Sequence, residues 1–238
     1  MPSDHSSKQY DQDLEGIRSN VLLMGGMVES QFADAVACFR TGNVEQADAT
    51  IKNDENVNRL EVTLDEACSH LIVRRQPAAN DLRIVMATSK LITDLERIGD
   101  EATKIARASK DIQSRGVATL NHYETVRVIA NRASYMLHDA LDAFARLDEA
   151  QATKIIAQDE IVDHEFRSIM RTLITFMMED PRTISAALDT MWVAKAIERI
   201  GDHCKNIAEY VVYVVEGKDI RHTGYASTKL SAEQDAQN

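Results

Sequence analysis

The sequence contains few of the residues that make turns. Only three prolines and nine glycines occur in 238 residues, and aromatic side chains make up 5% of the total. A sandwich or barrel of many short strands needs frequent turns, so this composition argues against both architectures. The long stretches between the few glycines and prolines instead indicate a helical protein.

Basic charge, a membrane-length apolar run and paired cysteines are also lacking. The formal net charge is −11, and because nucleic-acid binding needs a basic face, no nucleic-acid partner is expected. The longest strictly apolar run near the carboxyl end, residues 211–215, is too short to span a membrane, and no signal peptide is recognisable. We therefore expect no transmembrane segment and a cytoplasmic location. Cys38, Cys68 and Cys204 are odd in number and widely separated, which predicts reduced core thiols.

Apolar residues recur with helical spacing between residues 11 and 217. Asn43 is expected to begin the second helix through a capping box with Gln46, and Asp180 to begin the last one. The polar ends of the chain, residues 1–10 and 218–238, lack this spacing and are predicted to be mobile tails. We predict an all-α fold of six long helices, at about 14–40, 43–75, 80–114, 119–146, 149–178 and 181–216.

The second half of the chain repeats the first. Residues 35–39 (Ala-Val-Ala-Cys-Phe) align with residues 140–144 (Ala-Leu-Asp-Ala-Phe), and the pentapeptide Glu-Arg-Ile-Gly-Asp occurs both at 96–100 and at 198–202. A repeat of this length indicates duplication of a whole domain. Each half is therefore predicted to be an antiparallel three-helix bundle. The predicted bundles span residues 11–116 and 117–217.

Each pentapeptide places two carboxylates four residues apart, on one face of a helix. Counting along the antiparallel hairpins puts Glu96 and Asp100 level with Asp54 and Asn58. The same count in the second half puts Glu198 and Asp202 level with Asp159 and Asp163. Because clustered carboxylates repel each other unless a cation compensates them, the two hairpins predict two cation sites built from oxygen ligands.

Oxygen ligands favour hard cations. Magnesium, calcium and manganese suit such a set and iron is also compatible, whereas zinc prefers cysteine and histidine. Asn58 stands where the second half has Asp163, so the first site is expected to bind its cation more weakly. The alternative is that Arg97 and Arg199 neutralise these acids in an ionic network on the helix surface. Glycine is unfavourable inside a helix, so the glycine of each pentapeptide favours close approach of a neighbouring helix.

No catalytic motif accompanies the carboxylates. A di-metal oxidase needs Glu-x-x-His on two helices, and no histidine in the helical region has a glutamate three residues earlier. Phosphate loops, nucleophile elbows and His-Glu-x-x-His motifs are absent as well. We therefore predict that the protein is not an enzyme, with a carboxylate-bridged metalloenzyme or metal store as the alternative. His203 either adds a nitrogen ligand to the second site or only packs.

Two further features leave alternatives open. Arg74, Arg75 and Arg83 surround the turn between the second and third helices. They either compensate the carboxyl end of the helix or form a contact patch for an acidic partner. The pair Gly25-Gly26 in the first helix has no glycine counterpart in the fourth, so it marks a kink or a close helix contact, within the chain or across a dimer.

Several motifs together closely resemble the PhoU family. They are residues 24–29 (Met-Gly-Gly-Met-Val-Glu), residues 74–83 (Arg-Arg-Gln-Pro-Ala-Ala-Asn-Asp-Leu-Arg), both pentapeptides, and residues 177–180 (Met-Met-Glu-Asp). The resemblance covers residues 10–222 and implies two similar three-helix bundles. It also implies metal clusters held by Glu96, Asp100, Glu198 and Asp202, with Asp54, Asp159 and Asp163 as the facing acids.

The resemblance implies a regulatory function without turnover. PhoU proteins are bacterial accessory proteins of phosphate-specific transport, which repress the phosphate-starvation (Pho) regulon and restrain phosphate uptake. By this resemblance the chain links the ATPase of the phosphate ABC importer to a membrane-bound sensor histidine kinase. A homodimer, held at the inner face of the cytoplasmic membrane by protein partners, is the expected form.

Overall fold

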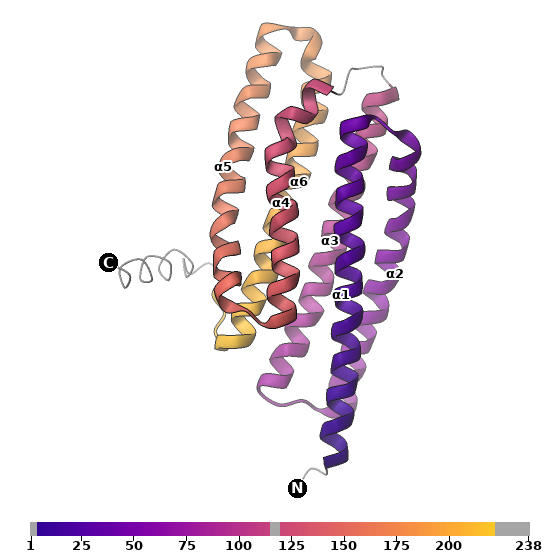
Figure 1. Ribbon diagram of the computed structural model, residues 1–238, viewed down its shortest axis with the longest axis vertical. Helices are drawn as coiled ribbons and strands as arrows, with labels where there is room; N and C mark the ends of the chain where they lie inside the picture. The colour runs from indigo at the N-terminus through magenta and orange to yellow at the C-terminus, as the bar shows by residue number, and fades with distance from the viewer. Residues whose placement is uncertain (1–3, 115–119, 222–238) are drawn as a thin grey trace, which may run out of the picture.

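The computed structural model describes residues 4–114 and 120–221, which form six long α-helices in two bundles (Figure 1). The predicted all-α architecture is confirmed, and the described residues contain no β-strand. One turn of 3₁₀ helix, η1 (Pro181–Thr183), precedes the last helix. The helices are α1 (Asp4–Thr41), α2 (Val44–Arg75) and α3 (Asn80–Ser114) in the first bundle, and α4 (Leu120–Arg146), α5 (Glu149–Glu179) and α6 (Ile184–Glu216) in the second.

Local sequence explains several helix ends. Asn43 caps α2, because its side-chain oxygen accepts a hydrogen bond from the Gln46 N–H at 3.0 Å. The capping box is only half formed, since the Gln46 side chain donates to Asp34 on α1 instead of reaching back to Asn43. Gly217 ends α6 in the left-handed region, with φ of 74°.

The amino-terminal end differs from the prediction. α1 begins at Asp4 and not near Leu14, so the predicted mobile tail over residues 1–10 is wrong for residues 4–10. Tyr10 and Leu14, four residues apart, both pack against the core and extend the apolar stripe of the helix. Polar neighbours hide this weak periodicity in the sequence.

The carboxyl-terminal end is partly described. Ile220 is buried against the core, and Arg221 pairs with the Asp219 carboxylate. Residues 218–221 therefore lie against the body of the protein, contrary to the predicted tail. The prediction for residues 222–238 falls outside the described residues.

One apolar core runs through both bundles. Met24, Phe32 and Leu95 belong to it and are almost completely buried. Each such side chain contributes about 1.5–3 kcal/mol through burial. Cys38, Cys68 and Cys204 are buried without a disulfide, as predicted, and burial raises the pKa of each thiol.

The two bundles pack side by side, mainly through α3 and α6 and additionally through α1 and α4. The α2–α3 connection lies at the lower end of the molecule and the α5–α6 connection at the upper end (Figure 1). α3 and α6 therefore run in opposite directions, as expected for two duplicated halves that face each other. This arrangement brings the two pentapeptide segments next to each other.

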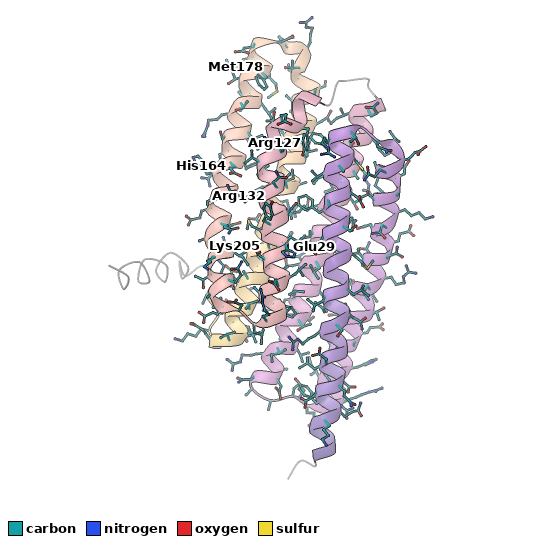
Figure 2. The ribbon with its side chains drawn as sticks, viewed as in Figure 1. Glu29, Arg127, Arg132, His164, Met178 and Lys205 are labelled. Carbon is teal, nitrogen blue, oxygen red and sulfur yellow. The ribbon has the colours of Figure 1, made fainter. Side chains whose placement is uncertain are left out.

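The contact between α1 and α4 explains the glycine pair. A Cβ atom on Gly25 would lie 2.6 Å from Leu141 of α4, whereas one on Gly26 would meet open space. Gly25 therefore allows α4 to approach within the same chain, which is the close-contact alternative. Glu29, labelled in Figure 2, lies one turn further along α1 and is 3.0 Å from His138 of α4.

α1 also contains the most membrane-like stretch of the described residues. By length and composition, residues 8–41 would suffice to cross a membrane, with a mean hydropathy of 1.3 over the most apolar window. In the structure, Met24, Val28 and Phe32 are buried, and α1 contacts α2, α3 and α4. It is thus built as a core helix, and core helices pass the same test of length and composition. No long uninterrupted apolar run marks residues 8–41 in the sequence, because polar residues divide this stretch.

Buried polar groups set the register of α3 on α6. Asp94 of α3 is only 2% exposed. It accepts hydrogen bonds from His203 Nδ1 at 2.7 Å, Asn206 Nδ2 at 3.2 Å and Tyr210 Oη at 2.8 Å. All three donors belong to α6. Sliding one helix along the other would leave the buried Asp94 and His203 without partners, so the apolar interface has one favoured alignment.

We expect Asp94→Ala to lower the free energy of unfolding by about 3–5 kcal/mol, because it removes the acceptor shared by the buried His203 and two half-buried donors. Urea unfolding followed by circular dichroism measures this loss. Asp48→Ala is the control, since Asp48 is exposed and pairs only with Lys110, and it should cost less than about 1 kcal/mol. Equal losses in the two variants would contradict the assigned role of Asp94.

Candidate carboxylate centres

The first acidic cluster lies on the α2–α3 hairpin. Asp54 and Asn58 of α2 and Glu96 and Asp100 of α3 meet there, and Asp54 is buried. Burial and then the charges of Asp100, Glu61 and Asp54 raise the pKa of Glu96. Counting along the hairpin had not identified Glu61, which supplies the carboxylate that Asn58 lacks. These five residues are called the first centre.

Neutral groups surround the first centre. Gln31 of α1 is 1% exposed. Its Nε2 donates to Asp54 Oδ1 at 2.9 Å, to the Gly99 carbonyl at 3.2 Å and to Thr103 Oγ1 at 3.1 Å. Asn58 Nδ2 donates to the other Asp54 oxygen at 3.3 Å. Within the described residues, no lysine or arginine forms an ion pair with a carboxylate of this centre. Gln31 Oε1 and Asn58 Oδ1 are buried without a hydrogen-bond partner.

The second centre consists of Asp159, Asp163, Glu198 and Asp202 on the α5–α6 hairpin. Carboxylate oxygens of Asp163, Glu198 and Asp202 lie within 4.8 Å of one another. Asp159 is 4% exposed, and its Oδ1 has no hydrogen-bond partner. Burial, and then the charges of Glu198, Asp159 and Asp163, raise the pKa of Asp202 to about 6. The hairpin thus brings together the four residues that the sequence placed level with one another.

Three cationic side chains pair with the second centre. Burial alone would lower the pKa of Lys205, but its bond to Asp159 raises that pKa above the usual value. Lys205 is labelled in Figure 2. The three pairs are Lys205 Nζ to Asp159 Oδ2 at 2.6 Å, Arg167 Nη2 to Asp163 Oδ2 at 3.2 Å, and Lys195 Nζ to Glu198 Oε2.

The arginines of the pentapeptides do not form the alternative ionic network. Arg199 crosses to the other bundle, where its Nη1 lies 2.9 Å from Glu101 Oε1 of α3. Arg97 is exposed, and its charge lowers the pKa of Glu96 by less than burial and the neighbouring carboxylates raise it. His203 bonds Asp94 of α3 through Nδ1, and its Nε2 is buried without a hydrogen-bond partner. The cluster of Asp163, Glu198 and Asp202 does not include His203.

The pentapeptide glycines give room to the facing helices. A Cβ atom on Gly99 would lie 3.3 Å from both Asp54 Oδ1 and Gln31 Oε1. One on Gly201 would lie 3.2 Å from Val162 of α5. Both distances are shorter than comfortable van der Waals contacts, so the glycines allow the close approach that the sequence indicated.

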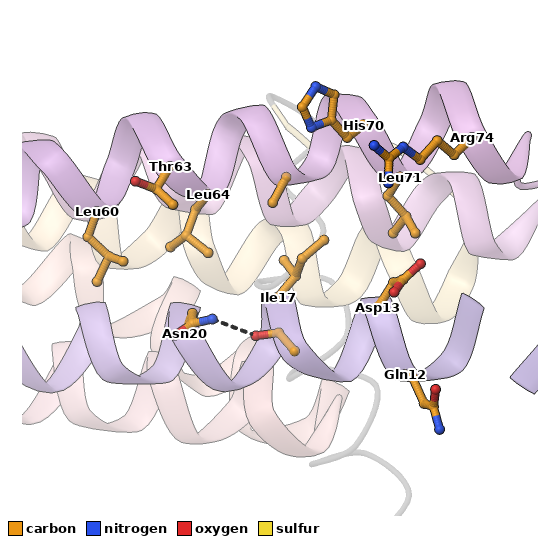
Figure 3. A pocket seen from close by; sticks show the side chains of 12 residues that line it. Gln12, Asp13, Ile17, Asn20, Leu60, Thr63, Leu64, His70, Leu71 and Arg74 are labelled. Carbon is orange, nitrogen blue, oxygen red and sulfur yellow. Dashed lines mark hydrogen bonds between the residues drawn. The ribbon is translucent and has the colours of Figure 1, made fainter. Parts of the chain in front are cut away.

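The three arginines near the α2–α3 turn have separate neighbours. Arg75 pairs with Asp13 of α1 at 2.9 Å. Arg83 lies against Gly217 at the carboxyl end of α6, where the helix dipole favours a cation. Arg74 lines a groove between α1 and α2 (Figure 3). Arg83 therefore compensates the carboxyl end of a helix, but that helix is α6 and not α2.

A groove beside Arg74 lies apart from the two centres. Its volume is about 490 Å³, and its lining includes none of the candidate ligands. Leu60, Leu64 and Ile17 form apolar walls, and Asp13 lies near Arg74 at one end (Figure 3).

Comparison with known proteins matches both bundles to one family. The PhoU domain model matches residues 21–109 and again residues 126–211. The phosphate-specific transport system accessory protein PhoU of Escherichia coli is 46% identical over 220 residues, which cover 92% of this chain and 90% of that protein. A PhoU homolog from Pseudomonas putida is 45% identical over 220 residues, covering 92% of this chain and 86% of the relative.

Solved structures of PhoU proteins have the same fold as this chain. The crystal structure of PhoU from Pseudomonas aeruginosa superposes with a TM-score of 0.85 at 43% identity, covering 88% of this chain and all (100%) of that one. The phosphate transport system regulatory protein PhoU from Streptococcus pneumoniae gives a TM-score of 0.81 at 25% identity, with 88% and 98% covered. The twofold match to the PhoU domain and these relatives show that the chain belongs to the PhoU family.

Proposed function

We propose that the chain is a metal-binding adaptor that represses the phosphate-starvation (Pho) regulon and restrains phosphate uptake. Its relatives are accessory proteins of the phosphate-specific transport system, and one is described as regulatory, which supports a role beside that transporter. Its partners are the ATPase of the phosphate ABC importer and a sensor histidine kinase. The chain acts as a homodimer at the cytoplasmic face of the membrane, where these partners hold it.

The carboxylate geometry supports the metal-binding part of this proposal. Both centres offer oxygen donors, and each contains a buried oxygen that no hydrogen bond satisfies. Native proteins rarely leave buried oxygens unpaired, and a hard cation such as magnesium, manganese or iron would satisfy them. Zinc fits less well because the centres contain neither cysteine nor histidine.

Contact rather than turnover is the proposed mode of action. A bound cation would offset the repulsion among the carboxylates, and so stabilise each hairpin and the surface it presents to a partner. A carboxylate-bridged oxidase is disfavoured because the helical region contains no Glu-x-x-His motif, and the cluster found among the described residues contains carboxylates and no histidine.

We expect high alkaline phosphatase activity in phosphate-rich medium when the gene is deleted, and low activity when the intact chain is restored. We expect a quadruple variant to leave the alkaline phosphatase activity high. It combines Glu96→Gln, Asp100→Asn, Glu198→Gln and Asp202→Asn. The charge-matched control neutralises four ion-paired acids on the surface, Asp48, Glu124, Asp142 and Asp219. This control should lower the alkaline phosphatase activity as fully as the intact chain does.

Low activity in the deletion would refute repression of the regulon. Silencing by the quadruple variant, produced at the normal level, would instead separate signalling from the carboxylate centres.

The raised pKa of Asp202 predicts how pH acts on the chelator-treated protein. Between about pH 4 and pH 6 the native state keeps a proton that the unfolded chain has lost, so this group's contribution to stability falls as the pH rises through that window. Manganese should therefore raise the melting temperature more at pH 7.5 than at pH 5, where protons compete for the carboxylate.

Asp202→Asn is the matching variant for this measurement. Without metal it should melt above the wild type at pH 7.5 and at the same temperature near pH 4, and manganese should shift it less. An unchanged manganese shift in Asp202→Asn would rule out the second centre as the binding site. Asp180→Asn is the control, because its neighbour Arg182 lowers the pKa of Asp180 and reverses the sign of the pH effect.

A further inference from the structure

The two centres occupy equivalent positions in the repeat but have different surroundings. The repeat aligns Asp54 with Asp159, Glu96 with Glu198, and Asp100 with Asp202. Five neighbouring positions carry different residues in the two halves. In order they are Asn58 and Asp163, Glu61 and Phe166, Val62 and Arg167, Thr93 and Lys195, and Thr103 and Lys205.

In the first centre these positions leave the negative charge uncompensated. Thr103 accepts its hydrogen bond from the neutral amide of Gln31, and Thr93 donates to the Ser89 carbonyl at 3.3 Å. Glu61 lies three residues after Asn58 and seven after Asp54 in α2, on the same helix face, and so adds a fourth carboxylate. Its charge also helps to raise the pKa of Glu96. Within the described residues this centre therefore has four carboxylates and no paired cation.

In the second centre the corresponding side chains supply positive charge. Lys195 lies between Glu198 and the ring of Phe166, with Nζ 5.4 Å from the ring centroid. Lys205 and Arg167 pair with two further carboxylates. This compensation explains why three carboxylate oxygens converge here, while no comparable group of three forms among the described residues of the first centre.

A buried oxygen without a hydrogen-bond partner lies beside the first centre and another lies in the second, and a bound cation would satisfy both. Gln31 Oε1 lies beside Asp54 in the first centre, and Asp159 Oδ1 lies in the second. Both side chains are more than nine-tenths buried, so the partner of each unpaired oxygen has to be an ordered water or a bound ion inside the protein. In the second centre a cation that reaches Asp159 meets a carboxylate already paired with Lys205.

We propose that Lys195, Lys205 and Arg167 are built-in counter-cations of the second centre and that Glu61 is a ligand of the first. The first centre then fills at low cation concentration, and the second fills only when metal displaces the lysines. This inference rests on the proposed metal binding at both centres. It reverses the expectation drawn from Asn58, because Glu61 replaces the missing charge.

The order of filling gives the second centre a regulatory property. Its occupancy follows the cation concentration in a range where the first centre is already full. Displacement also frees Lys195 from Glu198, and the added cation makes the charge of the α5–α6 hairpin more positive. The first centre, in contrast, has a structural role.

The test is a titration of the chelator-treated full chain with manganese, with free metal read by electron paramagnetic resonance. The wild type should show a tighter and a weaker class of sites. Glu96→Gln with Asp100→Asn should abolish the tighter class. Glu198→Gln with Asp202→Asn should abolish the weaker class.

Variants at the positions that differ between the two centres test whether the lysines and Glu61 cause the difference in metal affinity. Lys195→Met with Lys205→Met should tighten the weaker class about tenfold or more, and Glu61→Gln should weaken the tighter class about tenfold. Lys110→Met, which removes a lysine paired with the distant Asp48, should change neither class by more than about twofold. Lys195→Met alone, with its side chain 44% exposed, keeps the test valid if the double variant does not fold.

The outcomes separate this inference from the proposed function. Loss of the tighter class in the Glu198→Gln/Asp202→Asn variant, equal sites in the wild type, or no gain on removing Lys195 would each overturn the order of filling, while metal binding would stand. No manganese binding by the wild type would overturn both.

Discussion

The packing of α3 against α6 is the constraint on which the other features depend. Each of these helices carries a carboxylate pair on one face and the contact between the bundles on another. Asp94 and Glu101 of α3 bond His203 and Arg199 of α6, and each of these residues lies within two positions of a candidate ligand. The interface therefore fixes the rotation of both helices, and that rotation turns the carboxylates toward α2 and α5.

Duplication explains why two centres exist, and divergence explains why they differ. The backbone arrangement is repeated, including the glycines that admit the facing helix. The charges around the carboxylates are not repeated, because Gln31, Thr93 and Thr103 surround one cluster while lysines and an arginine surround the other. One backbone thus provides two electrostatic environments, without any change in the carboxylates placed by the pentapeptides.

The fold suits a protein that acts through contacts. The described residues form six long helices, and polar bonds between α3 and α6 hold the two bundles in one alignment. The relatives are accessory proteins of a transport system, and the proposed adaptor role would use the extended helix faces of the two bundles. The carboxylate centres lie on the α2–α3 and α5–α6 hairpins, so the proposed metal binding would change the charge of these two faces.

The sequence by itself determined the helices, the duplication and the pairing of carboxylates across each hairpin. These features depend on local periodicity, on caps such as Asn43, and on counting from a short turn. Only the tertiary structure decided that Gln31, Glu61 and Lys205 surround the centres, that Arg199 and His203 turn to the other bundle, and that α1 begins at Asp4. A polar residue beside an apolar stripe can reach either neighbouring helix. Its partner depends on how the bundles meet, which local sequence does not specify.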